Sequence, residues 1–131
     1  MRHLLIVEDQ PTDVRIAADI AQELGFTAIE ARTTASAAKV YLEKAIEGNA
    51  PLPELILLDL DLGYESGHEL LRFWHSNPGL AATQMVVWTV MGKEQQDLCR
   101  LFNVNAVVPK WEGVAALKRA LGSLSARVSQ Q

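Results

Sequence analysis

The chain has 131 residues, 49% of them hydrophobic, and a formal charge of −4. This length fits one domain with a buried core, and we expect no second domain. The apolar runs are too short to span a membrane or to form a signal peptide, so we expect a soluble, cytoplasmic protein without a membrane partner. The single cysteine, Cys99, excludes an internal disulfide, and the lack of a Lys/Arg cluster argues against direct nucleic-acid binding.

Hydrophobic periodicity in the first half of the chain predicts strands that alternate with helices. In order, we expect a strand over residues 4–7, an amphipathic helix over 14–24, a strand within 26–31, and a helix over 38–45. The first strand ends abruptly at Glu8 and Asp9. Gly25 ends the first helix, and Thr33 or Thr34 can cap the second one.

The second half continues the alternation around a central apolar strand. We expect a strand over residues 55–58, a loop over 61–66, a helix over 67–76, a strand over 85–90, a helix over 93–102, a strand over 106–108 and a helix over 114–124. Ser66 is a plausible N-cap that forms a capping box with Glu69. Leu98, Leu101 and Phe102 are expected to face inward, and the polar residues from Ser125 onward to fray.

Five strands that alternate with five helices indicate an α/β fold with a parallel sheet covered on both faces. A barrel of such units needs eight of them and far more residues. We therefore predict an open, doubly wound, flavodoxin-like (βα)5 sheet with strand order 2-1-3-4-5. The predicted domain covers residues 1–124, and residues 125–131 form a short polar tail.

In this arrangement the order of the strands reverses between the first and third strands, and open α/β sheets bind ligands at that point. Glu8, Asp9 and Asp59 end those two strands, so their carboxylates should converge. Thr89 ends the fourth strand and Lys110 follows the fifth, so both project from the same edge. Converging carboxylates favour a hard cation such as Mg²⁺, and a carboxylate such as Asp59 can also attack phosphorus.

With these residues, the chain resembles the receiver domain of bacterial two-component response regulators over nearly its whole length. The resemblance rests on residues 5–9, on Leu57-Leu58-Asp59 with Gly67 eight residues later, on Thr89, and on Pro109-Lys110. It implies that Asp59 is the phosphoacceptor, with Thr89 as the switch and Lys110 as the phosphoryl contact. The implied Mg²⁺ ligands are Asp9, Asp59 and the backbone carbonyl of Asp61, with Glu8 acting through water.

The resemblance also implies partners. A sensor histidine kinase or a histidine phosphotransfer protein would supply the phosphoryl group from a phosphohistidine. A downstream protein, or a second copy of this chain in a homodimer, would read the signal on the fourth helix, fifth strand and fifth helix. Such a stand-alone receiver catalyses only its own phosphorylation and dephosphorylation.

Four positions depart from the commonest receiver pattern. Gly63 replaces a frequent proline, Val90 a smaller alanine, Val107 an aromatic residue, and Trp111 a proline. Gly63 and Val90 keep a second hypothesis open, a pseudo-receiver that binds partners without phosphorylation, although the complete acidic set argues against it. A third hypothesis is a small phosphatase of the haloacid-dehalogenase type. In that family, however, the acidic pair follows the lysine in the sequence, whereas Glu8 and Asp9 precede the lysine here.

Individually, each of these residues also has an ordinary structural interpretation. Glu8 and Asp9 could begin a helix, Thr89 could be a β-branched strand residue, and Lys110 a solvated cation. Their joint placement at one sheet edge favours the functional interpretation. The three histidines share no ligand spacing and are predicted to lie on the surface: His3, His68 and His75.

Overall fold

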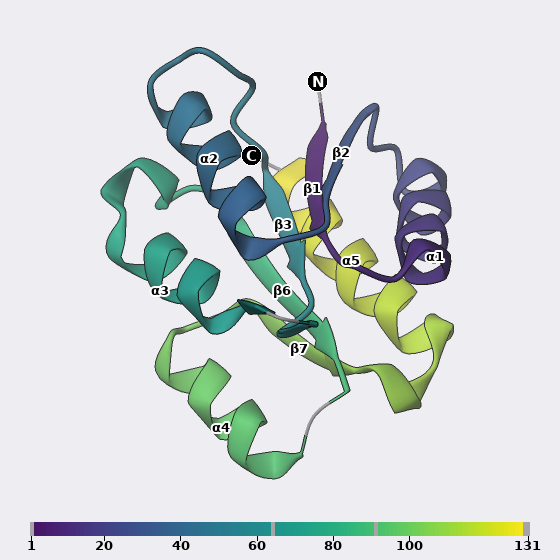
Figure 1. The fold of residues 1–131 in the computed structure, drawn as a ribbon. Helices are drawn as coiled ribbons and strands as arrows, with labels where there is room; N and C mark the ends of the chain where they lie inside the picture. Colours follow the sequence, from purple (N-terminus) through teal and green to yellow (C-terminus); the bar gives the residue numbers. More distant parts are fainter. Residues whose placement is uncertain (1, 64, 91, 130–131) are drawn as a thin grey trace.

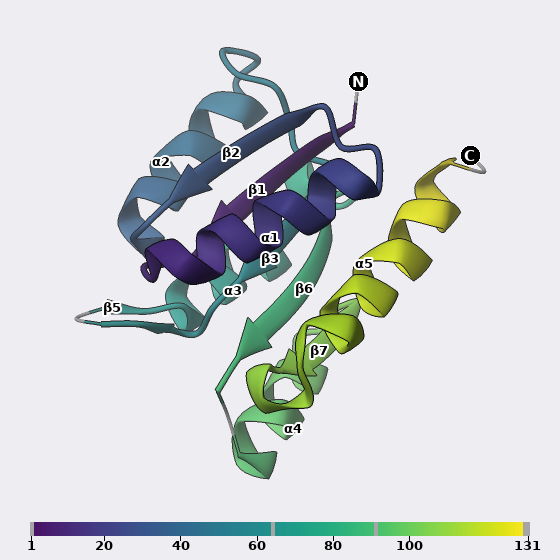
Figure 2. The ribbon, with the colours of Figure 1, turned by 90° about the vertical axis from the view of Figure 1, so that its right-hand side faces the viewer.

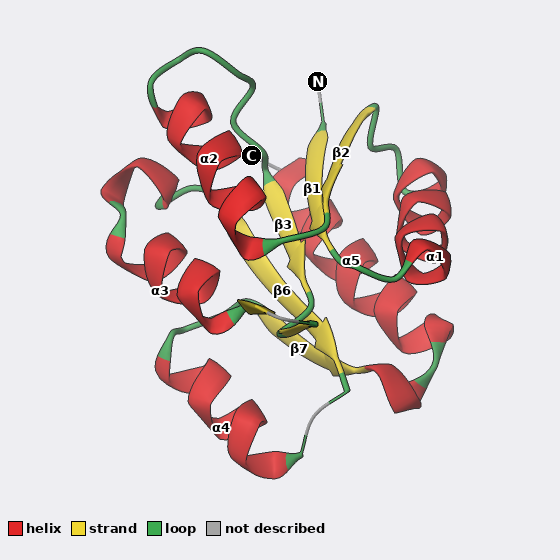
Figure 3. Cartoon of the chain, viewed as in Figure 1, coloured by secondary structure: helices red, strands yellow, loops and turns green. Residues whose placement is uncertain are grey.

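The structure, a computed structural model, describes residues 2–63, 65–90 and 92–129. Strands and helices alternate along this part of the chain around one sheet (Figure 1, Figure 3). The elements are β1 (His3–Val7), α1 (Pro11–Glu23), β2 (Ala28–Arg32), α2 (Ala35–Ile46), β3 (Leu55–Leu58), β4 (Asp61–Leu62), β5 (Glu65–Ser66), α3 (His68–Ser76), η1 (Pro78–Leu80), β6 (Gln84–Thr89), α4 (Lys93–Leu101), β7 (Ala106–Pro109), η2 (Lys110–Glu112) and α5 (Val114–Ser129).

The main sheet is parallel and has the strand order β2-β1-β3-β6-β7. This order confirms the predicted 2-1-3-4-5 arrangement, because β6 and β7 are the fourth and fifth strands of the sheet. Val7 pairs with Leu58, and Leu58 pairs with Val87. The residues that follow β1 and β3 therefore leave the sheet at the same level.

Alternate residues of the central strands pack into two separate cores. Leu5, Val7, Ile56 and Leu58 face α2 and α3. Side chains one position away on the same strands face α1 and α5. The helices thus cover both faces of the sheet, with α1 and α5 on one side and α2, α3 and α4 on the other (Figure 1, Figure 2). This double burial explains why the strands read as continuous apolar runs.

The last helix is longer than predicted. Instead of ending at Leu124, α5 continues through Ser129, and Ser125 is buried. The Arg2 guanidinium donates to the carbonyls of Ser125 at 3.2 Å and Leu24 at 2.9 Å, and thereby attaches this part of α5 to the start of the chain. Residues 130 and 131 of the predicted tail lie outside the described residues, and the division of the chain at residue 124 stays a prediction.

The segment after β3 contains a small hairpin where a plain loop was predicted. β4 and β5 pair antiparallel on either side of Tyr64, which lies outside the described residues. The Glu65 carboxylate accepts hydrogen bonds from the backbone N–H of Ser36 at 3.2 Å and from its hydroxyl at 2.6 Å. Because Ser36 is in the first turn of α2, the hairpin is attached to the positive end of that helix.

The capping box predicted for α3 is wrong. The N-cap is Gly67, not Ser66, and Glu69 does not bond back to it. The Ser66 hydroxyl instead accepts the backbone N–H of His68 at 3.2 Å, so it still satisfies one N–H of the first turn. For α2, the structure selects Thr34 as the cap, because its hydroxyl accepts the Ala37 N–H at 3.0 Å.

Of the three residues that were predicted to face inward from the fourth helix, only Phe102 packs against the core. Leu101 is 75% exposed and Leu98 is partly exposed, whereas Cys99 is fully buried in the core shared with α3. Val114, the first residue of α5, is likewise exposed. Short helices such as α4 give few apolar positions from which to assign a face, and here the periodicity selected the wrong one.

None of the helices in the described part of the chain is long and apolar enough to cross a bilayer.

His3 is buried on β1, in contrast to the surface position predicted for it. Its Nε2 lies 3.1 Å from the Tyr41 hydroxyl, and the two rings meet edge to face. Burial lowers the pKa of His3 below its ordinary value of 6.5. The folded state therefore favours the neutral imidazole.

We expect this burial to make stability fall in mild acid. Below the ordinary histidine pKa, the unfolded chain binds a proton at His3 that the folded chain does not, so the free energy of unfolding decreases as pH falls through that range. His3→Gln should flatten this dependence in urea unfolding series at several pH values. Equal slopes for the wild type and His3→Gln would contradict the expectation.

Candidate functional site

Three carboxylates meet where β1 and β3 end. Glu8 and Asp9 follow β1, and Asp59 follows β3, so the strand register places them side by side. One carboxylate oxygen from each lies within 4.8 Å of the others. Glu8 is 2% exposed and Asp59 is 5% exposed. The sequence predicted this convergence from the strand order.

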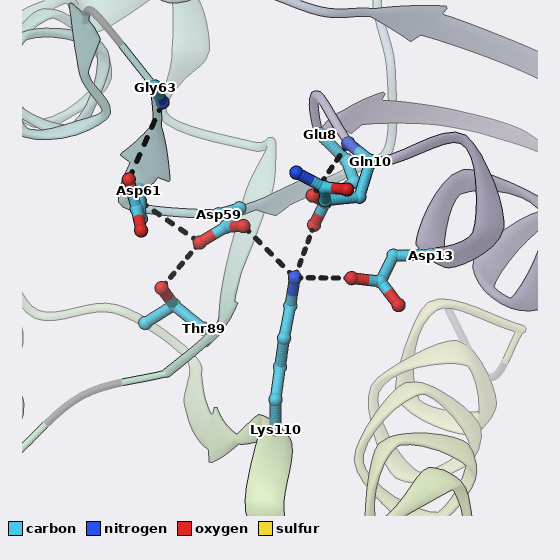
Figure 4. Close-up of polar contacts among 8 residues, drawn as sticks. All are labelled: Glu8, Gln10, Asp13, Asp59, Asp61, Gly63, Thr89 and Lys110. Atoms are coloured by element: carbon cyan, nitrogen blue, oxygen red, sulfur yellow. Dashed lines mark hydrogen bonds and ion pairs between the residues drawn. The ribbon is translucent and has the colours of Figure 1, made fainter.

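Lys110, which follows β7, provides the counter-charge (Figure 4). Its Nζ donates to Glu8 Oε2 at 2.9 Å, to Asp59 Oδ2 at 3.0 Å and to Asp13 Oδ2 at 2.7 Å. Asp13 lies in the first turn of α1 and was not among the predicted site residues. The sequence offered one indication of its role, because Asp13 comes four residues after Asp9. Acidic residues are common in the first turn of helices that carry no functional site, however, so this position alone does not identify a site residue.

The other oxygen of Asp59 is also held. Its Oδ1 accepts the Thr89 hydroxyl and, at 3.0 Å, the backbone N–H of Asp61. Thr89 is fully buried at the end of β6, next to β3 in the sheet. The Asp59 carboxylate is therefore fixed in orientation by Thr89 of β6, by Lys110 directly after β7 and by the backbone of its own loop.

Asp61 stands apart from the three-carboxylate cluster. Its side chain is exposed, and its Oδ1 lies 3.4 Å from the Gly63 N–H. Gly63 has a φ of +74°, and a Cβ at that position would lie 3.5 Å from Asp9 Oδ2. The turn after β4 thus passes close to Asp9. The Asp61 N–H donates to Asp59 Oδ1 at 3.0 Å, so the Asp61 backbone lies next to the cluster, whereas its carboxylate is not among the three that converge.

A cavity of about 320 Å³ opens over these groups. It is lined by Asp9, Gln10, Asp13, Asp59, Asp61, Gly63, Val90 and Lys110. Val90, which stands where receivers commonly have a smaller alanine, is 70% exposed and lines this cavity. Trp111, next to Lys110, is also exposed.

The electrostatics of the site reflect crowded negative charge. Burial raises the pKa of Glu8 to about 7, and the charge of Asp59 adds to this effect while the hydrogen bond from Lys110 opposes it. For Lys110, burial alone would lower the pKa, but hydrogen bonds to Asp13, Glu8 and Asp59 outweigh burial and raise it above its ordinary value. The ammonium is therefore permanently charged at neutral pH.

The donor set fits a divalent metal ion. Carboxylate and carbonyl oxygens are the ligands that hard cations prefer. Asp9 Oδ1 is buried and has no hydrogen-bond partner among the described residues, although it belongs to the cluster. A buried carboxylate oxygen without a donor is costly unless a cation or water satisfies it. The cluster therefore has the ligands that fit a divalent metal ion.

A five-stranded parallel sheet in this order, with an acidic cluster, a threonine and a lysine at its carboxyl edge, defines the class of response-regulator receiver domains. Comparison with known proteins agrees, and the chain belongs to the response-regulator receiver family. It is 33% identical over 121 residues to the probable methanogenesis regulatory protein FilR2 of Methanothrix harundinacea, across 90% of this chain and 77% of FilR2.

Other relatives are cyanobacterial. The chain is 31% identical over 93 residues to the response regulator Rcp1 of Synechocystis, across 70% of this chain and 63% of Rcp1, less than two thirds of that protein. The crystal structure of Mn²⁺-bound Rcp1 superposes with a TM-score of 0.77 at 26% identity, covering 96% of this chain and 93% of the other. The crystal structure of the phosphorylated cyanobacterial phytochrome response regulator RcpA superposes with a TM-score of 0.78 at 25% identity. The match covers 94% of this chain and 90% of the other. No family model matches the chain.

Proposed function

We propose that this protein accepts a phosphoryl group on Asp59 and signals through contacts with other proteins. The observation that carries the proposal is the Asp59 carboxylate itself. It is almost fully buried, yet it borders the cavity, and Thr89 and Lys110 hold its two oxygens. A carboxylate fixed in this way is prepared for nucleophilic attack rather than for solvation.

In the proposed reaction, an Asp59 oxygen attacks the phosphorus of a phosphohistidine. A P–O bond forms, the P–N bond breaks, and the imidazole leaves with the electron pair of that bond. Lys110 neutralises charge on the transferred group, and the Thr89 hydroxyl donates to it once the Asp59 oxygen is esterified. Phosphoryl transfer depends mainly on such positioning and charge neutralisation.

The metal of the proposed site is Mg²⁺. Asp9, Asp59 and the Asp61 backbone carbonyl would hold it, and Glu8 would act through a water molecule. A bound Mg²⁺ neutralises the oxygens of the phosphoryl group during transfer. The acidic cluster supports this assignment, and so does Rcp1, a relative whose structure contains Mn²⁺.

The proposed donor is a sensor histidine kinase or a histidine phosphotransfer protein, and the proposed location is the cytoplasm. The proposed readout surface is formed by α4, β7 and α5, for a downstream protein or for a second copy of the chain. Leu101 and Trp111 are exposed on or beside these elements. Under this proposal, the protein catalyses its own phosphorylation and dephosphorylation and no other reaction.

Metal dependence tests the proposal. The protein is incubated with acetyl phosphate and either Mg²⁺ or EDTA, and its intact mass is measured. We expect a phosphoryl adduct with Mg²⁺, little or none with EDTA, and a rate reduced by about 100-fold or more in Asp9→Asn, because that variant loses a proposed metal ligand. Asp19→Asn, an exposed position on α1, is the matched control. An adduct that forms equally fast in EDTA would contradict the proposed mechanism.

A further inference from the structure

All three N–H groups of the Lys110 ammonium are engaged in hydrogen bonds. A lysine ammonium offers three N–H bonds. Glu8, Asp13 and Asp59 each accept one of them, at 2.9, 2.7 and 3.0 Å (Figure 4). A phosphoryl group on Asp59 would bring further oxygens to the same ammonium, so at least one present partner must give up its hydrogen bond or share it.

The three partners differ in how easily they can be released. Glu8 is 2% exposed, and the alternative donor to its side chain is the Gln10 N–H at 3.2 Å. An ionised Glu8 without Lys110 would be a buried and poorly compensated charge. Asp13 is 25% exposed and lines the open cavity, so water can replace the lysine there. Asp13 is therefore the carboxylate that releases Lys110 at the lowest cost.

We propose that Asp13 is a positioning residue that holds Lys110 in the unphosphorylated protein and competes with the phosphoryl group for it. This inference rests on the proposed function of Asp59. It adds a residue of α1 to a site otherwise built from strand ends. The charge of Asp13 also acts on the two charged species that enter the cavity, since it attracts a metal cation and repels a phosphoryl group, which carries about two negative charges.

The proposal predicts that one substitution lowers the affinity for Mg²⁺ but raises the rate of phosphorylation. Asp13→Asn keeps the size of the side chain but removes its charge. We expect Mg²⁺ to bind about three- to tenfold more weakly, and phosphorylation by acetyl phosphate at saturating Mg²⁺ to be about three- to tenfold faster. A merely structural role for Asp13 would instead lower the melting temperature and reduce both metal affinity and rate.

The test measures both quantities for the wild type, Asp13→Asn and Asp19→Asn. Asp19 is exposed on the same helix, so its substitution removes an equal charge away from the site. Mg²⁺ is titrated into the unphosphorylated protein and followed by tryptophan fluorescence, because the Trp88 ring lies 4.9 Å from Lys110 Nζ. The rate is followed by intact mass.

Weaker Mg²⁺ binding together with faster phosphorylation in Asp13→Asn alone supports the inference. If the wild type is phosphorylated and Asp13→Asn matches Asp19→Asn, or is slower than the wild type, the inference is overturned while the proposed function stands. If no protein in the series, wild type included, forms an adduct, the proposed function fails and the inference falls with it.

Discussion

Replacing Lys110 by methionine lowers the free energy of unfolding by about 3 kcal/mol near neutral pH without added metal. Lys110 is 15% exposed and carries the positive charge for Glu8, Asp13 and Asp59. Removing one member of a buried ionic cluster leaves the others uncompensated, which is far more costly than losing a surface pair. Urea unfolding of the wild type and of Lys110→Met measures the difference.

The loss of unfolding free energy in Lys110→Met should become smaller as the pH is lowered. Without the ammonium, the pKa of Glu8 rises further above its already raised value. The folded state then binds a proton that the unfolded state lacks, so stability increases as pH falls through this range. Added Mg²⁺ should also recover part of the loss, because the cation replaces the missing positive charge.

Lys118→Met is the matched control for this change. Lys118 Nζ pairs with Glu23 Oε2 at 2.7 Å, but both side chains are more than half exposed. Exposed pairs contribute little, so we expect a change of at most about 0.5 kcal/mol. If Lys110→Met were as stable as Lys118→Met near neutral pH, the described ion cluster would not be the interaction that holds the site together.

Replacing Gly67 by alanine should damage both the fold and the site. A Cβ at Gly67 would lie 2.6 Å from the Asp59 carbonyl oxygen and 2.9 Å from Leu60 Cα, both of them backbone atoms. The Gly67 N–H also donates to the Leu60 carbonyl at 2.9 Å, so the two segments cannot separate without losing that bond. We expect a loss of about 2–3 kcal/mol of stability. The Asp59 backbone should shift, and phosphorylation by acetyl phosphate should fall by about tenfold or more.

Gly122→Ala is the control for Gly67→Ala. Gly122 lies within α5, and a Cβ there would meet Leu24 Cδ2 at 3.7 Å, an ordinary contact. Alanine favours a helix interior over glycine, so this variant should be as stable as the wild type or more stable by up to about 1 kcal/mol. Wild-type stability and phosphorylation in Gly67→Ala would contradict the close approach that the structure shows.

The sheet and the core of the site could be predicted because their determinants are local. Each central strand is an apolar run that ends in a polar residue, and parallel connectivity then places Glu8, Asp9 and Asp59 at one edge. The same reasoning placed Thr89 and Lys110 there. Strand number and alternation were sufficient for this part because few topologies satisfy them.

Features that depend on tertiary contacts could not be predicted in this way. Asp13 joins the site only because α1 packs so that its first turn faces Lys110, which comes from the other end of the chain. His3 is buried by its position on β1, where Tyr41 of α2 covers it. In α4, where nine residues offer little periodicity, Cys99 took the core position that had been assigned to Leu98 and Leu101.

The most direct test of the proposed role of Asp59 is the intact mass of the wild type and Asp59→Asn after incubation with acetyl phosphate and Mg²⁺. The wild type should gain a single phosphoryl group, and Asp59→Asn should gain none while it unfolds as cooperatively as the wild type. An equal adduct on both proteins, or no adduct on a folded wild type that binds Mg²⁺, would contradict the assignment of Asp59 as the phosphoacceptor.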